Sequence, residues 1–274
     1  QGACGDASAL LNRATQGLYT PGSTFNDPGY CTEYGQKISN ALNPDQTAES
    51  YGHVTFSQGL EHSINSVFCN VGEHIGAKTI MDYAKRFGFY KLPPLETPAN
   101  ERLPSGLYKN GRLDNDFAHA DPGRLAFGQY TLQVTPLQMC MVVAAVANNG
   151  VVPRPYVVQK IVGPDGSAIR TAHPGNLGRA IKPQTAAELN QMMQLVVQGG
   201  TGTSAQIPGI KVAGKTGTAE TGINHVYTAW FVSFAPADNP QVAVAVVLEK
   251  QSNGFGGAVA APIAKQVMQA LLGR

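Results

Sequence analysis

The hydrophobic pattern changes along the chain, from helical spacing in the first two thirds to strand-like runs near the C-terminus. Apolar residues that recur every three or four positions predict four helices, over 58–70, 77–89, 136–147 and 183–197. Ser57 is the expected cap of the first helix and Gly88 the stop of the second. The helix over 136–147 is apolar all round, so we expect it to be central and buried.

The C-terminal third carries three consecutive strand candidates, 211–220, 226–235 and 241–250, and then a helix from Pro262 to Leu272. The last two strands are joined by the short turn PADNP, which predicts an antiparallel meander. Helical segments followed by consecutive strands and a closing helix indicate an α+β fold, with an antiparallel sheet covered by helices on both faces. No linker divides residues 1–274, so we expect one domain.

Composition narrows the possible partners. Charged residues make up 14% of the chain and the net charge is +2 without a basic run, so no nucleic-acid partner is expected. The cysteines have no C-x-x-C spacing and no histidine pair has metal-ligand spacing, so a metal site is not expected. Cys140 lies in an apolar run and is predicted to be buried. Cys31 and Cys69 could form a disulfide in an oxidising compartment, but the sequence does not decide whether they pair.

Two short polar motifs are the candidate chemistry. Lys215, Thr216, Gly217 and Thr218 stand on the first predicted strand, where the glycines let a ligand approach and a cation with hydroxyls could hold a carboxylate. Ser63-x-Asn65 lies upstream, near the end of a predicted helix. Taken alone, the first motif is also compatible with an ordinary strand end, and the second with a polar pair that satisfies backbone groups at a helix end.

Five blocks in a fixed order carry a family resemblance. Besides the two motifs they are NRATQGLYTPGSTF at 12–25, FGQYTLQVTPLQMCMVVAAVANNG at 127–150 and GGTGTSAQIPGIK at 199–211. Together they resemble the transpeptidase domain of class B penicillin-binding proteins, from about Asn12 to Leu272. The resemblance implies a β-lactamase/transpeptidase-like fold and a D,D-transpeptidase that cross-links peptidoglycan stem peptides through a serine acyl-enzyme. It also implies acylation by β-lactams, and no cofactor.

The resemblance assigns roles to particular residues. Ser23, in the PGSTF stretch, would attack the penultimate D-alanine carbonyl. Ser63, Asn65 and Lys215 would complete the catalytic group, and Thr216, Gly217 and Thr218 would bind the substrate. A serine hydroxyl needs an adjacent base, which a lysine one helical turn further on supplies in this family.

This chain departs from the family pattern immediately after Phe25. The family has lysine where this chain has Asn26, and the following residues lack a helical apolar pattern. We therefore expect that a segment near residues 25–26 is missing from this sequence. Ser23 is then either the nucleophile or part of a downstream look-alike. The alternative is a catalytically inactive scaffold that keeps the fold and the ligand cleft.

Other activities and the cellular context remain as expectations. A D,D-carboxypeptidase or a β-lactam sensor shares the same acylation chemistry, whereas a β-lactamase is disfavoured because the segment around Glu188 lacks the expected spacing of a deacylating base. The resemblance implies a location at the extracytoplasmic face of the bacterial cytoplasmic membrane, anchored by an N-terminal segment outside this sequence. It also implies a membrane glycosyltransferase, divisome or elongasome partner.

Overall fold

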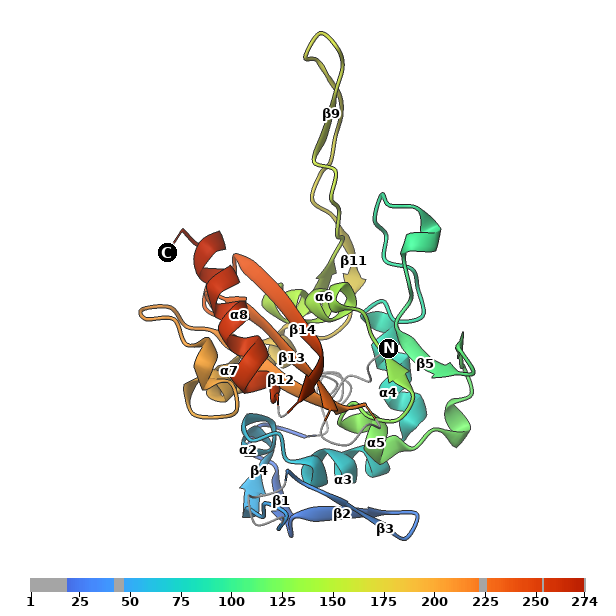
Figure 1. The fold of residues 1–274 in the computed structure, drawn as a ribbon, viewed down its shortest axis with the longest axis vertical. Helices are drawn as coiled ribbons and strands as arrows, with labels where there is room; N and C mark the ends of the chain where they lie inside the picture. The colour runs from blue at the N-terminus through green and yellow to red at the C-terminus, as the bar shows by residue number, and fades with distance from the viewer. Residues whose placement is uncertain (1–18, 42–46, 222–225, 253, 274) are drawn as a thin grey trace.

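A three-stranded antiparallel sheet organises the computed structural model, which describes residues 19–41, 47–221, 226–252 and 254–273 (Figure 1). Its strands are β12 (Ala213–Glu220), β13 (Val226–Ala235) and β14 (Val242–Ser252), in that spatial order. β13 lies between its two sequence neighbours, and Lys215 of β12 pairs with Val232 of β13. The predicted meander is confirmed.

Helices cover both faces of this sheet (Figure 1). Alternate side chains of β13 point to opposite sides, because successive residues of a strand do so. Trp230, Val232 and Phe234 join the hydrophobic core beneath α6 (Pro136–Ala147) and α7 (Pro183–Gln198). Phe231 and Ala235 join the smaller core beneath α8 (Gly256–Leu271). The α+β fold with a sheet covered on both faces is therefore confirmed.

A second group of elements packs beside the sheet, below it and to its right in Figure 1. It contains four helices: α2 (Phe56–Glu61), α3 (Asn65–Ile75), α4 (Ala77–Arg86) and α5 (Pro122–Ala126). It also contains two antiparallel ribbons, β1 (Thr24–Asp27) with β4 (Gly52–Thr55), and β2 (Tyr30–Glu33) with β3 (Gln36–Ser39). Contacts between α2 and α7 join this group to the sheet.

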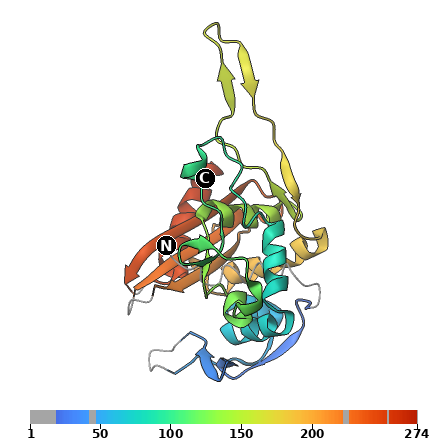
Figure 2. The ribbon, with the colours of Figure 1, turned by 90° about the vertical axis from the view of Figure 1, so that its right-hand side faces the viewer.

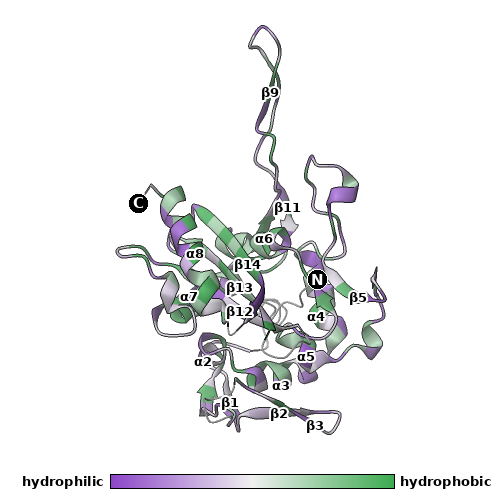
Figure 3. Ribbon diagram, in the orientation of Figure 1, coloured by the Kyte–Doolittle hydropathy of each residue, from purple (hydrophilic) through white to green (hydrophobic). Residues whose placement is uncertain are grey.

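Smaller elements complete the chain. β5 (Gly106–Lys109) pairs with β6 (Arg112–Leu113) and β7 (Leu132–Gln133), and short 3-10 helices occupy Ala99–Glu101, Phe117–His119 and Thr203–Ala205. A long hairpin projects from the body (Figure 2), with β8 (Val151–Pro153) and β11 (Asn176–Arg179) at its base, and β9 (Lys160–Val162) and β10 (Ala168–Thr171) toward its tip. All residues of β9 and β10 are exposed, and hydrophobic and hydrophilic residues mix along them (Figure 3).

Three of the predicted helices are present with small shifts at their ends, namely α4, α6 and α7. Thr135 caps α6, since its side chain accepts a hydrogen bond from the Gln138 N–H. Most side chains of α6 are buried, as predicted, but Cys140 is only half-buried. None of the helices in the described ranges is both long enough and apolar enough to cross a bilayer.

Two predicted helices have different limits. The helix expected over 58–70 is divided into α2 and α3 by Ser63, whose φ of 55° is left-handed, and Thr55 rather than Ser57 caps α2. The last helix begins at Gly256 instead of Pro262, which lies inside it. Pro262 removes one helical hydrogen bond. The helix continues past it because Ala260, Ala261 and Ala264 are buried against the sheet.

Candidate active site

Ser63 and Lys215 meet although 152 residues separate them in the sequence. The Lys215 side chain is wholly buried, and its Nζ donates hydrogen bonds to Ser63 Oγ and to the Thr216 carbonyl oxygen, the latter at 3.0 Å. Lys215 is therefore not the exposed side chain of an ordinary strand end, the other interpretation that the motif alone allowed. Burying an ammonium group is costly unless it is hydrogen-bonded, so these contacts determine where the side chain lies.

The turn between α2 and α3 presents Ser63 to the lysine. Its N–H bonds back to the Leu60 carbonyl at 3.4 Å, and its left-handed backbone is uncommon for a residue other than glycine. Leu60 and Ile64 on either side are 0% and 1% exposed. Their burial holds the unfavourable turn in place, and the turn places the hydroxyl outside both helices.

The side chains of Thr216 and Thr218 lie on the face of β12 opposite to that of Lys215. The hydroxyls of Thr216 and Thr201 are 2.7 Å apart, and Thr218 Oγ1 accepts a hydrogen bond of 3.2 Å from the Gly256 N–H at the start of α8. A hydroxyl that accepts one bond can still donate one, so Thr218 can donate to a carboxylate. Gly217 lies against α8 so closely that a Cβ on Gly256 would be 2.5 Å from the Gly217 carbonyl oxygen.

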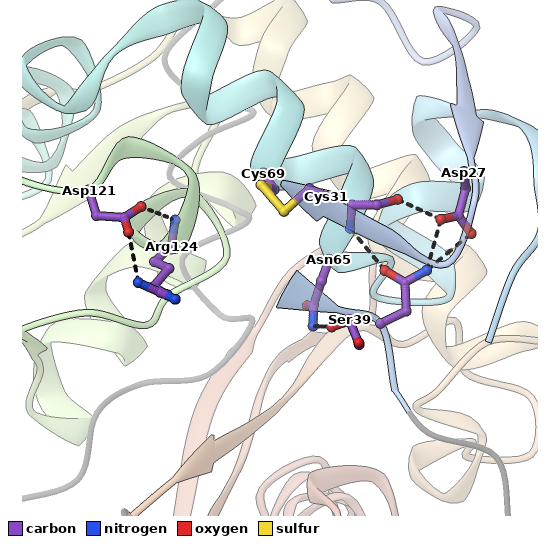
Figure 4. Close-up of a disulfide and its surroundings, with 9 residues drawn as sticks. Asp27, Cys31, Ser39, Asn65, Cys69, Asp121 and Arg124 are labelled. Carbon is purple, nitrogen blue, oxygen red and sulfur yellow. Dashed lines mark hydrogen bonds and ion pairs between the residues drawn. A yellow bond between two sulfur atoms is a disulfide. The ribbon is translucent and has the colours of Figure 1, made fainter. Parts of the chain in front are cut away.

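Asn65 lies in the same turn region but faces elsewhere. It is the first residue of α3, and its side-chain amide donates to the Ser39 carbonyl oxygen at 3.1 Å (Figure 4). The structure therefore brings Ser63 and Lys215 together, while the hydrogen bond of Asn65 is directed toward β3. Its catalytic role stays a prediction.

Ser23 lies in a turn just before β1. Its Oγ accepts from the Thr20 N–H at 3.0 Å and is 3.3 Å from the Thr20 hydroxyl, and its carbonyl oxygen accepts from the Phe56 N–H at 2.7 Å. Asn26 follows on β1, which pairs with β4 and is a strand rather than a helix. The hydrogen bonds recorded for Ser23 in the described ranges include none to Ser63 or Lys215. The NRATQG part of the first block, residues 12–17, lies outside these ranges.

A buried carboxylate that sequence patterns did not single out fixes the residues around α3. Asp27 is 1% exposed (Figure 4). Its side chain accepts five hydrogen bonds of 2.6–3.1 Å, one each from Gly29 N, Tyr51 N and Ser66 Oγ and two from Asn40 Nδ2. Burial alone would raise the pKa of Asp27, but these hydrogen bonds outweigh burial and hold the pKa below its ordinary value. Ser66 belongs to α3, so the network positions the turn that carries Ser63.

A disulfide between Cys31 and Cys69 ties β2 to α3 (Figure 4). Its sulfur atoms are 2.09 Å apart, and 38 residues separate the two cysteines in the sequence. The pairing that the sequence left open is therefore formed. Together with the Asp27 network, it attaches the β1–β4 region to the helix that follows Ser63.

Glu33 lies beside this disulfide in a very different environment. It is 2% exposed, and in the described structure neither carboxylate oxygen accepts a hydrogen bond from a donor. Gly123 makes room for it, because a Cβ there would be 1.9 Å from Glu33 Oε1. Burial, together with the nearby carboxyl groups of Asp121 and Glu73, raises the pKa of Glu33 to about 9.

Comparison with known proteins identifies the family. Residues 14–269 match the model of the penicillin binding protein transpeptidase domain, so this chain belongs to that family. The match covers most of the sequence and includes both Ser63 and Lys215.

Particular relatives agree with this. The chain is 34% identical over 291 residues to the peptidoglycan D,D-transpeptidase PbpA of Mycolicibacterium smegmatis, covering 97% of this chain and 57% of PbpA. Penicillin-binding protein A from M. tuberculosis, solved as a ceftriaxone acyl-enzyme complex, has a TM-score of 0.85 at 29% identity, covering 98% of this chain and 61% of that one. The D,D-transpeptidase domain of a peptidoglycan glycosyltransferase from Eggerthella lenta has a TM-score of 0.81 at 30% identity, covering 99% of this chain and 65% of that one.

Two facts about length accompany these matches. The chain spans 57% of the length of the mycobacterial PbpA. The PbpA alignment extends over 291 residues, more than the 274 residues of this chain, so it includes residues of PbpA that have no counterpart here.

Proposed function

We propose that this chain is the catalytic domain of a D,D-transpeptidase that cross-links peptidoglycan stem peptides through a serine acyl-enzyme. The observation that carries the proposal is the hydrogen bond between the buried Lys215 and Ser63. Lys215 lies on β12, which is an edge strand of the described sheet. An edge strand can pair with an extended peptide through backbone hydrogen bonds. The strand thus offers a peptide-binding edge, and its Lys215 holds the hydroxyl of Ser63, which comes from the turn between α2 and α3.

Each residue has a defined part in this proposal. The nucleophilic serine attacks the penultimate D-alanine carbonyl, the peptide C–N bond breaks, and the serine proton passes to the departing D-alanine amine. Ser63, hydrogen-bonded to Lys215, relays that proton, and Asn65 orients the peptide. Thr216, Gly217 and Thr218 hold the terminal carboxylate. The amine of a second stem peptide then attacks the ester and restores the serine.

For the nucleophile we propose Ser23, with its partner lysine in a segment missing between Phe25 and Asn26. The length of the PbpA alignment supports a missing segment, since PbpA has residues that this chain lacks. The turn at Ser23 supports it as well, because the Phe56 N–H ties Ser23 to the start of α2, the helix that leads to Ser63.

The rival function is an inactive scaffold that keeps the cleft but does not acylate. One observation favours it: the residue at the lysine position is Asn26, and it lies on a strand paired with β4. A chain with this sequence and no further segment lacks the base that a serine nucleophile requires.

The cellular setting is part of the proposal. Cross-linking takes place on peptidoglycan outside the cytoplasmic membrane, so the domain would act at the extracytoplasmic face on an N-terminal anchor. It would work beside a membrane glycosyltransferase or with a division or elongation complex. The Cys31–Cys69 disulfide supports an oxidising location, because cytosolic reductants keep most thiols reduced.

The intact mass of the natural protein, with and without a β-lactam, tests the proposal. A mass well above 28.9 kDa, with a covalent shift of one β-lactam, is expected, and peptide mapping should place the adduct on Ser23. Ser63→Ala and Lys215→Ala should each slow the adduct. A mass of 28.9 kDa without an adduct would favour the inactive scaffold.

A further inference from the structure

The Ser63–Lys215 hydrogen bond connects two different elements, and other residues must hold these elements in place. Ser63 follows α2, whereas Lys215 lies on β12. Hydrogen bonds within α2 cannot fix its end relative to the sheet. A third segment must connect the two elements if their side chains are to stay within hydrogen-bond distance.

Residues 199–202, which follow α7, form such a connection. The Thr201 N–H donates to the Glu61 carbonyl oxygen at 3.3 Å, two residues before Ser63. The Thr201 hydroxyl pairs with the Thr216 hydroxyl at 2.7 Å, one residue after Lys215. One threonine therefore contacts both the end of α2 and the strand that carries the lysine.

The packing around Thr201 leaves it little room to shift. A Cβ on Gly200 would be 2.4 Å from the Glu61 carbonyl oxygen, and one on Gly257 would be 2.1 Å from the Thr201 carbonyl oxygen. The segment therefore lies directly between α2 and the start of α8. Since neither glycine position has room even for a Cβ, the backbones are in close contact. A displacement of one element is then transmitted to the next, because packed protein has low compressibility.

The Thr216 hydroxyl depends on Thr201. Thr216 is 5% exposed, so water reaches it poorly, and its recorded hydrogen-bond partner in the described structure is Thr201 Oγ1. A buried hydroxyl without a partner is unfavourable, so loss of the Thr201 hydroxyl favours a shift of this part of β12. Lys215 is the adjacent residue and would move with it.

We propose that Thr201 is a positioning residue that holds Ser63 against Lys215 for the acylation step. This inference rests on the proposed transpeptidase function and extends it to a residue on neither motif. Thr201 acts through Thr216 and through the backbone of α2, not on the substrate.

The test uses Thr201→Val, which keeps the shape of threonine without its hydroxyl, and Thr201→Ser, which keeps the hydroxyl. In the full-length protein, the maximal rate of β-lactam acylation should fall roughly fivefold for Thr201→Val, the effect of losing one hydrogen bond, and stay within about twofold for Thr201→Ser. The β-lactam concentration for half-maximal rate should not change. Thr216→Val should lower the maximal rate as far as Thr201→Val does, but it should also raise the half-maximal β-lactam concentration, because Thr216 is itself proposed to hold the carboxylate. The maximal rate of the double variant should be no lower than that of either single variant, because the two hydroxyls make one interaction.

A purely structural role gives a different result. It would lower the fraction of protein that can be acylated, counted by adduct stoichiometry, and leave the rate of the remaining molecules unchanged. That outcome, or equal rates for Thr201→Val and the parent protein, would overturn the inference.

If the parent protein forms no adduct, the proposed function fails, and the positioning role is decided by crystal structures. Loss of the Ser63–Lys215 hydrogen bond in Thr201→Val but not in Thr201→Ser supports the role. Retention of that bond in both variants refutes it.

Discussion

Two buried carboxyl groups near α3 show how surroundings decide the charge of a side chain. Asp27 is surrounded by donors, which favour its ionised form and lower its pKa. Glu33 is about equally buried but has carboxyl groups for neighbours. Its charged form would be both desolvated and repelled, so Glu33 is protonated at neutral pH. A carboxyl side chain is thus an anion at Asp27 and a neutral acid at Glu33.

Glu33 should make the stability of the folded protein depend on pH. Its pKa rises from an ordinary 4.5 to about 9 on folding, so the folded state binds the proton more tightly than the unfolded state. The contribution is fully present below pH 4.5 and is lost as the pH rises toward 9. Glu33→Gln has no proton to lose, and its amide can donate to Asp121 and Glu73. Urea unfolding should therefore show the variant more stable than the parent at pH 8, by at least about 1 kcal/mol, the value of one pKa unit.

At pH 4, below the ordinary pKa of 4.5, the Glu33→Gln variant and the parent should differ by less than about 0.5 kcal/mol, as for a substitution that removes no interaction. Glu101→Gln, at an exposed position, is the matched control and should not change the pH dependence. A parent protein whose unfolding free energy follows that of Glu33→Gln from pH 4 to pH 8 would contradict the raised pKa.

Sequence patterns pointed to some of the important residues and not to others. Lys215, Thr216 and Ser63 stand in short motifs with glycine or asparagine, so they were visible without a structure. Asp27 and Glu33 lie at the ends of β1 and β2, in a polar part of the sequence without a regular apolar pattern, where nothing distinguishes a buried carboxyl from an exposed one. Their burial depends on contacts with α3 and α5, which are distant in the sequence. Thr201 lies in the block at 199–211, but nothing within that block distinguishes it, since its role depends on contacts with Glu61 and Thr216.

Elements whose packing follows their own periodicity were predictable. β13 and β14 read as apolar strands because both faces of the sheet are covered, and α6 reads as buried because it lies against them. The division between α2 and α3 was not predictable, since the residues around Ser63 keep a helical pattern. The start of α8 was misplaced because proline usually marks the first turn of a helix.

The disulfide is the covalent link between the β2–β3 ribbon and α3, and its removal should destabilise the folded protein. The cysteines are 38 residues apart, and closing a loop of that length lowers the entropy of the unfolded chain by an amount worth about 4 kcal/mol. The double variant Cys31→Ala/Cys69→Ala should lose roughly that free energy of unfolding in urea. Treatment of the parent with dithiothreitol should give a similar loss.

Cys140→Ala provides the control for this experiment, because Cys140 is outside the disulfide and only half-buried. Without reductant it should unfold at nearly the same urea concentration as the parent, apart from a small packing loss. With dithiothreitol it should lose stability as the parent does, because it retains the Cys31–Cys69 disulfide. Equal stability of the parent and the double alanine variant would show that the ribbon and α3 hold together without the bond.

Across the whole molecule, the candidate site lies where the two groups of elements meet. Lys215 comes from the sheet and Ser63 from the group below it, so their contact requires both groups to fold and pack. The turn at Ser23 belongs to the lower group through Phe56. Chemistry at this site is therefore a property of the assembled domain, and a change in the lower group reaches it even where the sheet is intact.

The junction between Phe25 and Asn26 lies inside β1, so an inserted segment would interrupt the pairing of β1 with β4. We still expect the junction to accept it, because each side has anchors of its own. Ser23 is held by Thr20 and Phe56, and Asp27 by its own hydrogen-bond network. We expect the 274-residue chain to take up no β-lactam. Insertion of the M. smegmatis PbpA segment that follows the counterpart of Phe25 should create a covalent adduct on Ser23, measured by intact mass and peptide mapping. A Gly-Ser insert of equal length should fold without forming the adduct, since it restores spacing but not the base. An adduct on the parent chain, or one that survives Ser23→Ala in the chain with the PbpA insert, would show that the nucleophile lies elsewhere.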